Sequence, residues 1–290
     1  MLIKIVEHVL NGLLAGAYYL LIALGLTLIF SLGGLVNLAH GAFYALGAYF
    51  AVKIADVLGF GPAFVLSPIA VALIGIVVER SLFRRFYRED PALGLLLTFG
   101  LAMVAEQALR WIFGAAPIPF SIPPALKGQV LVGDFIYSKY RLLMFAVATV
   151  AVGGLWVLLQ KTPFGRVVRA GVQNPDMLAA LGISLAPYMA SVVALAVALA
   201  ALAGVLLAPI SGVHPAMGAD ILTASFVVVV IGGLGSFWGV VLAALIVGVV
   251  RGLTIYFYPP AAEASMYLLM VLVLLFRPRG LFGERIQRFE

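Results

Sequence analysis

The chain has 290 residues, of which 64% are hydrophobic and only 10% are charged, and its formal net charge is +6 at pH 7. Soluble domains carry about a quarter charged residues, so this composition excludes a water-soluble surface and indicates a membrane protein. The chain contains no cysteine, which excludes disulfides and thiolate chemistry. The cytoplasmic loops of membrane proteins carry an excess of Lys and Arg, which explains the net positive charge better than nucleic-acid binding does. No nucleic-acid partner is therefore expected.

Long uncharged runs alternate with short charged stretches along the chain. A helix needs roughly 20 apolar residues to cross a bilayer, and continuously apolar runs favour helices over a barrel. We expect one all-α integral membrane domain over 1–290, a polytopic bundle of eight or nine spans with glycine-rich broken helices. The expected spans are 9–31, 36–52, 62–78, 92–113, 142–159, 188–208, 222–234, 237–257 and 261–276.

The first unusual segment is 31–43, inside the longest uncharged run. It contains three glycines together with an amide and an imidazole side chain, namely Gly33, Gly34, Gly41, Asn37 and His40. Irregular backbone at membrane depth is tolerated against protein or a water-lined cavity, and polar groups there often line a solute path. These residues are therefore candidates for a translocation path or gate. In the alternative, the glycines allow close helix packing while Asn37 and His40 bond a neighbouring helix.

The second segment is a basic loop at 160–187. Asn174, Pro175 and Asp176 are typical of a helix start, with a capping side chain, a proline at the first helical position and an acid in the first turn. A short helix over 177–181 is expected to end at Gly182. Its exposed Met and Leu side chains would suit docking on a soluble partner, and the alternative is an interfacial connector helix. The docking candidates are Arg166, Arg169, Asn174, Pro175, Asp176, Met177, Leu178, Leu181 and Gly182.

The third segment, 231–239, interrupts the uncharged run 221–250. Its candidate path residues are Gly232, Gly233, Gly235 and Ser236. Glycines here favour a chain reversal or an unwound turn. A pair of glycine-interrupted segments in the two halves of a chain points to the working region of a transporter, whereas the alternative is a plain tight turn between two spans. The two segments share little more than Gly-Gly-Leu.

Loop charges predict the orientation. Alternate loops place eleven of the eighteen basic residues on one side, namely Arg80, Arg84, Arg85, Arg88, Lys161, Arg166, Arg169, Arg277, Arg279, Arg285 and Arg288. The positive-inside rule makes that side cytoplasmic, with the C-terminus inside and the N-terminus outside.

Other charged residues favour simple interpretations. Glu106 and Arg110 lie four residues apart and are expected to form a structural ion pair. His214 and Asp220 are expected in an external loop, and no spacing of histidines and carboxylates suggests a metal site. No Gly-x-x-x-x-Gly-Lys-Ser/Thr phosphate loop occurs, so this chain is not expected to be an enzyme with its own ATPase site.

Residues 11–30, followed by Asn37-Leu-Ala-His-Gly41, resemble the LivH-type permeases of bacterial branched-chain amino acid ABC importers. Further resemblance lies in Gly165-Arg166, Asn174-Pro175, Leu181-Gly182-Ile183 and Gly232-Gly233-Leu234-Gly235-Ser236 with Gly239. The resemblance implies the ABC importer permease fold in a bacterial inner membrane, and inward transport of branched-chain or similar amino acids by alternating access. Relatives for urea or short amides, and a self-sufficient secondary transporter, are the alternatives within transport.

The resemblance also implies partners. They are a second, LivM-type permease, two cytoplasmic ATPase subunits, a periplasmic or extracellular substrate-binding protein and the lipid bilayer. ATP would be hydrolysed by the partner subunits, this chain would bind no cofactor, and the helix at 174–182 would rest in a groove of the ATPase. A membrane enzyme is the alternative outside transport, but no paired His/Asp or acidic cluster supports it.

Overall fold

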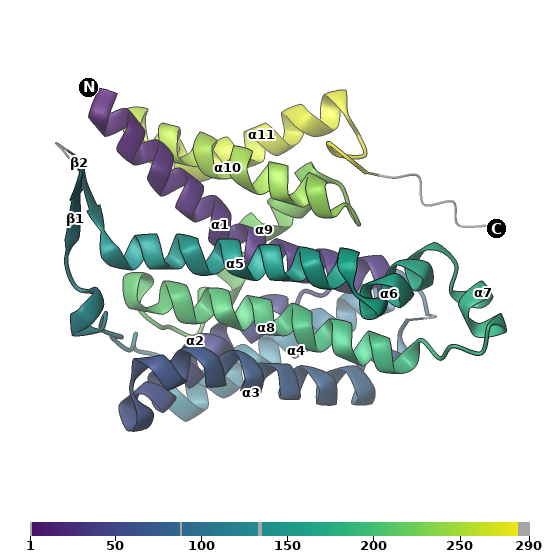
Figure 1. Ribbon diagram of the computed structural model, residues 1–290. Helices are drawn as coiled ribbons and strands as arrows, with labels where there is room; N and C mark the ends of the chain where they lie inside the picture. Colours follow the sequence, from purple (N-terminus) through teal and green to yellow (C-terminus); the bar gives the residue numbers. More distant parts are fainter. Residues whose placement is uncertain (1, 88, 133–134, 284–290) are drawn as a thin grey trace.

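The computed structural model describes residues 2–87, 89–132 and 135–283 as a bundle of long helices (Figure 1). The long helices are α1 (Leu2–Gly33), α2 (His40–Leu58), α3 (Phe60–Ser81), α4 (Pro91–Phe113), α5 (Lys139–Lys161), α8 (Ala186–Ser211), α9 (Met217–Gly232), α10 (Phe237–Phe257) and α11 (Ala262–Phe276). Within the described residues, eight helical segments are long and apolar enough to cross a membrane, α11 being counted with the turn before it as Pro259–Phe276, and α9 is a shorter apolar helix of 16 residues. The predicted helical membrane bundle is therefore confirmed.

Shorter elements connect the long helices. Helices α6 (Pro163–Gln173) and α7 (Pro175–Ala180) join α5 to α8, and three 3₁₀ turns lie at Phe83–Arg85, Pro124–Leu126 and Pro259–Ala261. Strands β1 (Gln129–Val132) and β2 (Phe135–Ser138) form an antiparallel hairpin in which Gln129 pairs with Ser138. The hairpin was not predicted, although two runs rich in β-branched and aromatic residues on either side of Gly133-Asp134 are a hairpin signal.

The bundle has two distinct ends (Figure 1). At the hairpin end, the first half of α1 meets the β1–β2 hairpin and α5, because the Tyr137 hydroxyl and the Arg141 guanidinium donate to Asn11 Oδ1 at 3.2 and 2.6 Å. At the opposite end, which we call the α7 end, Gly33 at the end of α1 lies against the ring of Tyr87. Helices α6 and α7 and the chain after α11 lie at this same end.

Helices α1 and α8 form the centre of the bundle. In their most apolar windows, 78% and 72% of residues are buried, against 22% or less in α3, α4, α5 and α11. Helix α1 packs along α10 at glycines that leave no room for a Cβ, Gly12 and Gly16 facing Gly248 and Gly252. Small residues let membrane helices approach closely enough for extensive van der Waals contact. The outer helices are left to face lipid or another subunit.

Two parts of the chain repeat one pattern in opposite directions. Helix α1 runs toward the α7 end and stops at Gly34, which has φ +65°, before α2 begins six residues later. Helix α8 runs toward the hairpin end and stops at Gly212, with φ +72°, before α9 begins. Each following helix starts after an alanine that gives no side-chain cap. Helices α2 and α9 begin inside the bundle, where His40 and Met217, their first residues, are buried, and they run in opposite directions.

Candidate translocation and coupling sites

The first helical turns of α2 and α9 cross at a pair of glycines. Gly41 lies against the carbonyl of Gly218, and Gly218 lies against the carbonyl of Gly41, with no space for a Cβ on either residue. Gly41 was predicted as a path residue, whereas Gly218 was not. The counterpart of the break at 31–43 is thus the segment 212–218, not the predicted segment 231–239.

Two predicted polar residues lie next to this crossing and are fully enclosed. Asn37 is 1% exposed in the irregular stretch before α2, and His40, the first residue of α2, is 0% exposed. The imidazole lies over α1, where a Cβ on Gly25 would come within 2.6 Å of its Nε2 atom. Both residues are therefore in the interior of the bundle, as the sequence indicated.

The polar atoms of Asn37 and His40 lack partners. The His40 ring approaches the Ile22 backbone, but neither ring nitrogen, nor either amide atom of Asn37, makes a hydrogen bond of normal geometry within the described chain. A buried polar group left unpaired costs about 1–3 kcal/mol. The alternative in which the side chain bonds a neighbouring helix is therefore not seen for Asn37, while the His40 ring stays close to the α1 backbone at Ile22.

Gly33 and Gly34 end α1 beside the loop that follows α3. The ring of Tyr87 fills the space over Gly33. The Tyr87 hydroxyl is buried without a hydrogen-bond partner among the described residues, and burial, aided by the charge of Glu79, raises the pKa of this phenol above its usual range. Gly33 and Gly34 therefore lie at the α7 end of the bundle, away from the α2–α9 crossing.

The predicted segment 231–239 is a tight turn between α9 and α10. Gly233 and Gly235 have φ of +97° and +91°, and Ser236 caps α10 by accepting from the Gly239 amide at 3.1 Å. The Gly232 carbonyl, at the end of α9, accepts from the Phe282 amide at 3.1 Å. The turn therefore lies at the α7 end against the chain after α11, and the structure does not bring it to the α2–α9 crossing.

The predicted docking segment contains the expected capped helix. Asn174 Oδ1 accepts from the Met177 amide at 2.9 Å, Pro175 is the first residue of α7 and Asp176 lies in its first turn. The helix begins at Pro175, as the capping pattern predicted, and ends at Ala180, and Gly182 follows it with φ +76°. Helix α7 projects from the bundle beyond α6 (Figure 1).

One docking candidate is buried, which corrects the expectation that the Met and Leu side chains of α7 are all exposed. Met177 and Leu181 are 58% and 70% exposed, but Leu178 is only 5% exposed. Leu178 is buried although it directly follows the exposed Met177, and its carbonyl accepts from the Ile183 amide at 3.2 Å. Arg166 is exposed, whereas Arg169 donates to the Leu159 carbonyl and so ties α6 to α5.

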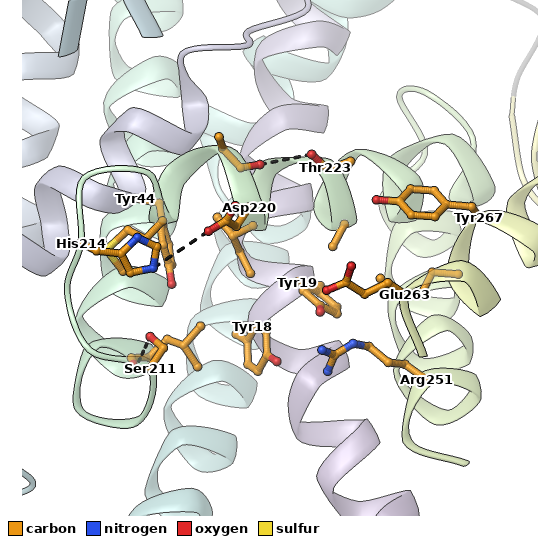
Figure 2. A pocket seen from close by; sticks show the side chains of 16 residues that line it. Tyr18, Tyr19, Tyr44, Ser211, His214, Asp220, Thr223, Arg251, Glu263 and Tyr267 are labelled. Carbon is orange, nitrogen blue, oxygen red and sulfur yellow. Dashed lines mark hydrogen bonds and ion pairs between the residues drawn. The ribbon is translucent and has the colours of Figure 1, made fainter. Parts of the chain in front are cut away.

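A polar cavity opens between His214 and Asp220 on one side and Arg251 and Glu263 on the other (Figure 2). It has a volume of about 520 Å³ and lies among α1, α2, α8, α9, α10 and α11. Sequence reasoning missed it. Asp220 was expected in an external loop with His214 but lies in α9, where its Oδ2 atom is 4.0 Å from His214 Nε2. Arg251, a single arginine in otherwise uncharged α10, was the available signal.

Two further expectations concern an ion pair on α4 and the placement of possible metal ligands. The Arg110 guanidinium lies 2.7 Å from the Glu106 carboxylate, so the predicted pair on α4 is confirmed. In the parts of the chain that the structure describes, no three His, Asp or Glu side chains are placed to hold a metal ion.

A family model and several curated relatives all match this chain to the same family. The family model for "Branched-chain amino acid transport system / permease component" matches residues 8–276. The high-affinity branched-chain amino acid transport system permease proteins BraD of Pseudomonas aeruginosa and LivH of Salmonella typhimurium are 29% and 28% identical, each over 96% of this chain and 95% of its own length. LivM of Salmonella typhimurium is 30% identical over 91% of this chain and 67% of its own length.

A solved structure shares the fold. PsaBC from Streptococcus pneumoniae in complex with Fab matches with a TM-score of 0.52 and 12% identity over 95% of each chain. The family match over residues 8–276, nearly the whole bundle, shows that the chain belongs to the permease components of branched-chain amino acid transport systems.

Proposed function

We propose that this chain is one permease subunit of an ATP-driven importer that moves branched-chain amino acids inward. The observation that carries the proposal is the family match across residues 8–276, which spans both halves of the bundle and the segment between them. The curated relatives BraD and LivH are named for branched-chain amino acid transport.

The proposed machine needs three kinds of partner. Relatives of both the LivH and the LivM type match this chain, which supports a LivM-type permease as its second half. Two ATPase subunits would supply the energy by hydrolysing ATP, and a periplasmic or extracellular binding protein would deliver the solute. The coupling loop at 160–187 would contact the ATPase through Met177 and Leu181, which α7 exposes at the tip of the molecule.

The charge distribution supports the proposed orientation. The described members of the basic set predicted to be cytoplasmic belong to the end of α3, the α5–α6 region and the segment after α11, all at the α7 end: Arg80, Arg84, Arg85, Lys161, Arg166, Arg169, Arg277 and Arg279. Arg88, Arg285 and Arg288 lie outside the described residues. The positive-inside rule makes the α7 end cytoplasmic, with the C-terminus inside and the N-terminus outside.

The proposed mechanism is alternating access around the α2–α9 crossing. Closure of the ATPases would push α7, and α6 would transmit the movement to α5 and α8, which it contacts through Arg169 and the stacked rings of Phe164 and Tyr188. Asn37 and His40 would gain hydrogen-bond partners when the helices rearrange, which makes them the best-supported gate candidates. The turn at Gly232 to Ser236, and Gly33 with Gly34, would act as flexible ends of the moving helices.

The test is transport by the assembled complex. The chain is co-expressed with its LivM-type partner and ATPases, reconstituted in proteoliposomes with the binding protein, and assayed with radiolabelled leucine, isoleucine, valine and urea. We expect uptake of the three amino acids that requires ATP. Uptake of urea without the amino acids, or uptake by this chain alone driven by a proton or sodium gradient, would overturn the proposal.

A further inference from the structure

The polar cavity contains charged groups of both signs, and its arginine is paired with neither of its carboxylates. Arg251 and Glu263 lie on the same side of the cavity, beside Tyr19, while Asp220 and His214 lie on the opposite side (Figure 2). Among the described residues, Arg251 makes no ion pair, and its Nε atom is buried without a hydrogen-bond partner. A half-buried guanidinium without a partner inside a membrane helix is costly and marks a functional site.

The cavity reaches from an exposed rim to the centre of the bundle. Its rim includes the exposed residues Ser211, Asp220 and Glu263, whereas Tyr44 of α2 is 1% exposed. Tyr44 follows Gly41 by three residues, so the inner end of the cavity adjoins the α2–α9 crossing. A solute in this cavity would stand directly before the proposed gate.

Part of the lining is apolar. Met217, Ile221 and Met266 are at most 8% exposed and contribute apolar surface to the cavity. The volume of about 520 Å³ falls within the range of about 300–1,000 Å³ typical of small-molecule sites. Such sites combine an apolar lining with a few polar groups that fix the orientation of the ligand.

We propose that this cavity binds a zwitterionic amino acid, with Arg251 receiving the carboxylate, Glu263 receiving the ammonium group, and the aliphatic side chain lying against Met217, Ile221 and Met266. Arginine suits the first role because its planar guanidinium donates two parallel hydrogen bonds to a carboxylate. Asp220 is less suited to the second role, since His214 already lies 4.0 Å away. This assignment rests on the proposed function and adds a site to it.

The first test is ligand protection of a single cysteine, which the cysteine-free chain allows. Ser211→Cys places a thiol at the cavity rim, and Ser81→Cys, at the exposed end of α3, is the matched control. The assembled complex is labelled with a maleimide in the presence of leucine, 4-methylpentanoate or isopentylamine. We expect leucine to slow labelling of Ser211→Cys by about fivefold or more, and the two analogues to have little effect, because each lacks one of the charged groups that fix the ligand.

The second test changes the charges. Arg251→Gln and Glu263→Gln are each expected to lower leucine uptake about tenfold or more, because each leaves one charged end of the bound ligand unpaired. Arg251→Lys should restore part of the uptake, and Arg110→Gln, which removes an exposed arginine on α4, should leave it unchanged. Protection of Ser211→Cys by leucine should disappear in the Arg251→Gln background.

The outcomes separate the two proposals. If the wild-type complex imports leucine but leucine does not protect Ser211→Cys, the cavity assignment is wrong and the proposed function stands. If Arg251→Gln does not assemble, protection in the Ser211→Cys complex with intact Arg251 still decides the question. Equal protection by leucine and isopentylamine would exclude Arg251 as the carboxylate site. A wild-type complex that imports none of the three amino acids would overturn the proposed function itself.

Discussion

Gly41 and Gly218 meet backbone to backbone, so the position of α2 relative to α9 depends on the absence of two side chains. A methyl group at either position would require the helices to move apart. Because the two helices begin in the interior, such a shift would open space around Asn37 and His40 rather than at the surface. This contact is where a small change should have the largest effect on both stability and transport.

Gly41→Ala tests this contact. We expect the substitution to destabilise the complex by about 1–3 kcal/mol, as overpacking does in a closely packed interior, and to abolish leucine uptake. The measurements are the thermal unfolding midpoint of the purified complex and uptake in proteoliposomes. Gly153→Ala is the matched control, because a Cβ on this glycine of α5 meets nothing within 4 Å. An unchanged midpoint with normal uptake in Gly41→Ala would show that the crossing tolerates separation.

Asn37→Leu separates a gating role from a packing role. Because the Asn37 amide makes no hydrogen bond in the described structure, an apolar side chain of similar size should leave stability unchanged or raise it by about 1 kcal/mol. If Asn37 gains partners in another conformation, uptake should fall about tenfold, which corresponds to about 1.4 kcal/mol of lost stabilisation in that conformation. Lower stability with normal uptake would instead support the packing alternative.

Residue type and position identified part of the site before the fold was known. Asn37, His40 and Gly41 stood out because polar groups and glycines are uncommon in a long apolar run. Gly218 did not, because a glycine near a predicted loop is ordinary in sequence, and Arg251 was a visible signal whose neighbours the sequence could not supply. Their importance depends on which residues α2, α10 and α11 bring next to them, and that pairing is a property of the folded chain.

The segment 160–187, proposed to couple the chain to an ATPase, combines an anchored helix with a projecting one. Helix α6 is held to α5 by Arg169 and to α8 by the stacked rings of Phe164 and Tyr188, which are 5.8 Å apart. Helix α7 has six residues, so it cannot be stable as an isolated helix. Its Asn174 cap, the burial of Leu178 and the αL glycine after it maintain its shape. This leaves Met177 and Leu181 as an exposed apolar pair.

Leu181→Asp tests docking by α7. Surface substitutions usually change stability by no more than about 0.5 kcal/mol, so the chain should fold normally while ATP hydrolysis no longer drives leucine uptake. ATPase activity and uptake are measured on the same proteoliposomes. Leu131→Asp is the control, since Leu131 is also 70% exposed but lies in the hairpin at the other end. Normal coupling in Leu181→Asp would exclude this face of α7, whereas Leu178→Asp would be uninformative because it buries a charge.

The sequence predicted the bounds of continuous apolar helices more accurately than it predicted where a helix is interrupted. Hydropathy placed 237–257 at the observed bounds of α10 and 92–113 within one residue of α4, because lipid-facing length is set by apolar composition. The start of α2 was expected at 36 and lies at His40, since the uncharged run continues through the irregular stretch. The start of α9 was expected at 222 and lies at Met217, because Asp220 was taken as a loop residue when it lines a cavity.

At the scale of the whole molecule, two parts of the chain run in opposite directions around the α2–α9 crossing. Helices α1 and α8 cross the bundle in opposite directions, and each is followed by a positive-φ glycine and a helix that begins inside. Inverted repeats with discontinuous helices are typical of transporters in which one part moves against the other around a central site. The sequence could not reveal this relation, because the two breaks share only a few small residues.

The inverted arrangement also makes the membrane orientation directly testable. If the α7 end is cytoplasmic, a thiol in the hairpin and a thiol on α7 must react from opposite sides of the membrane. Leu131→Cys and Leu181→Cys are introduced separately into the cysteine-free chain, and both positions are 70% exposed, so differences in accessibility arise from the membrane and from partner subunits. In intact cells, a membrane-impermeant maleimide should label Leu131→Cys but not Leu181→Cys, and permeabilisation should expose the second.

Partner subunits provide the internal control for this labelling. In permeabilised cells, Leu181→Cys should react more slowly when the ATPases are co-expressed than when they are omitted, because docking would cover α7, whereas Leu131→Cys should react equally with and without them. Labelling of Leu181→Cys in intact cells would reverse the assigned orientation. It would also place α7 on the side where no ATPase could reach it, so the coupling role of the 160–187 loop and the assignment of its exposed leucine would be rejected together.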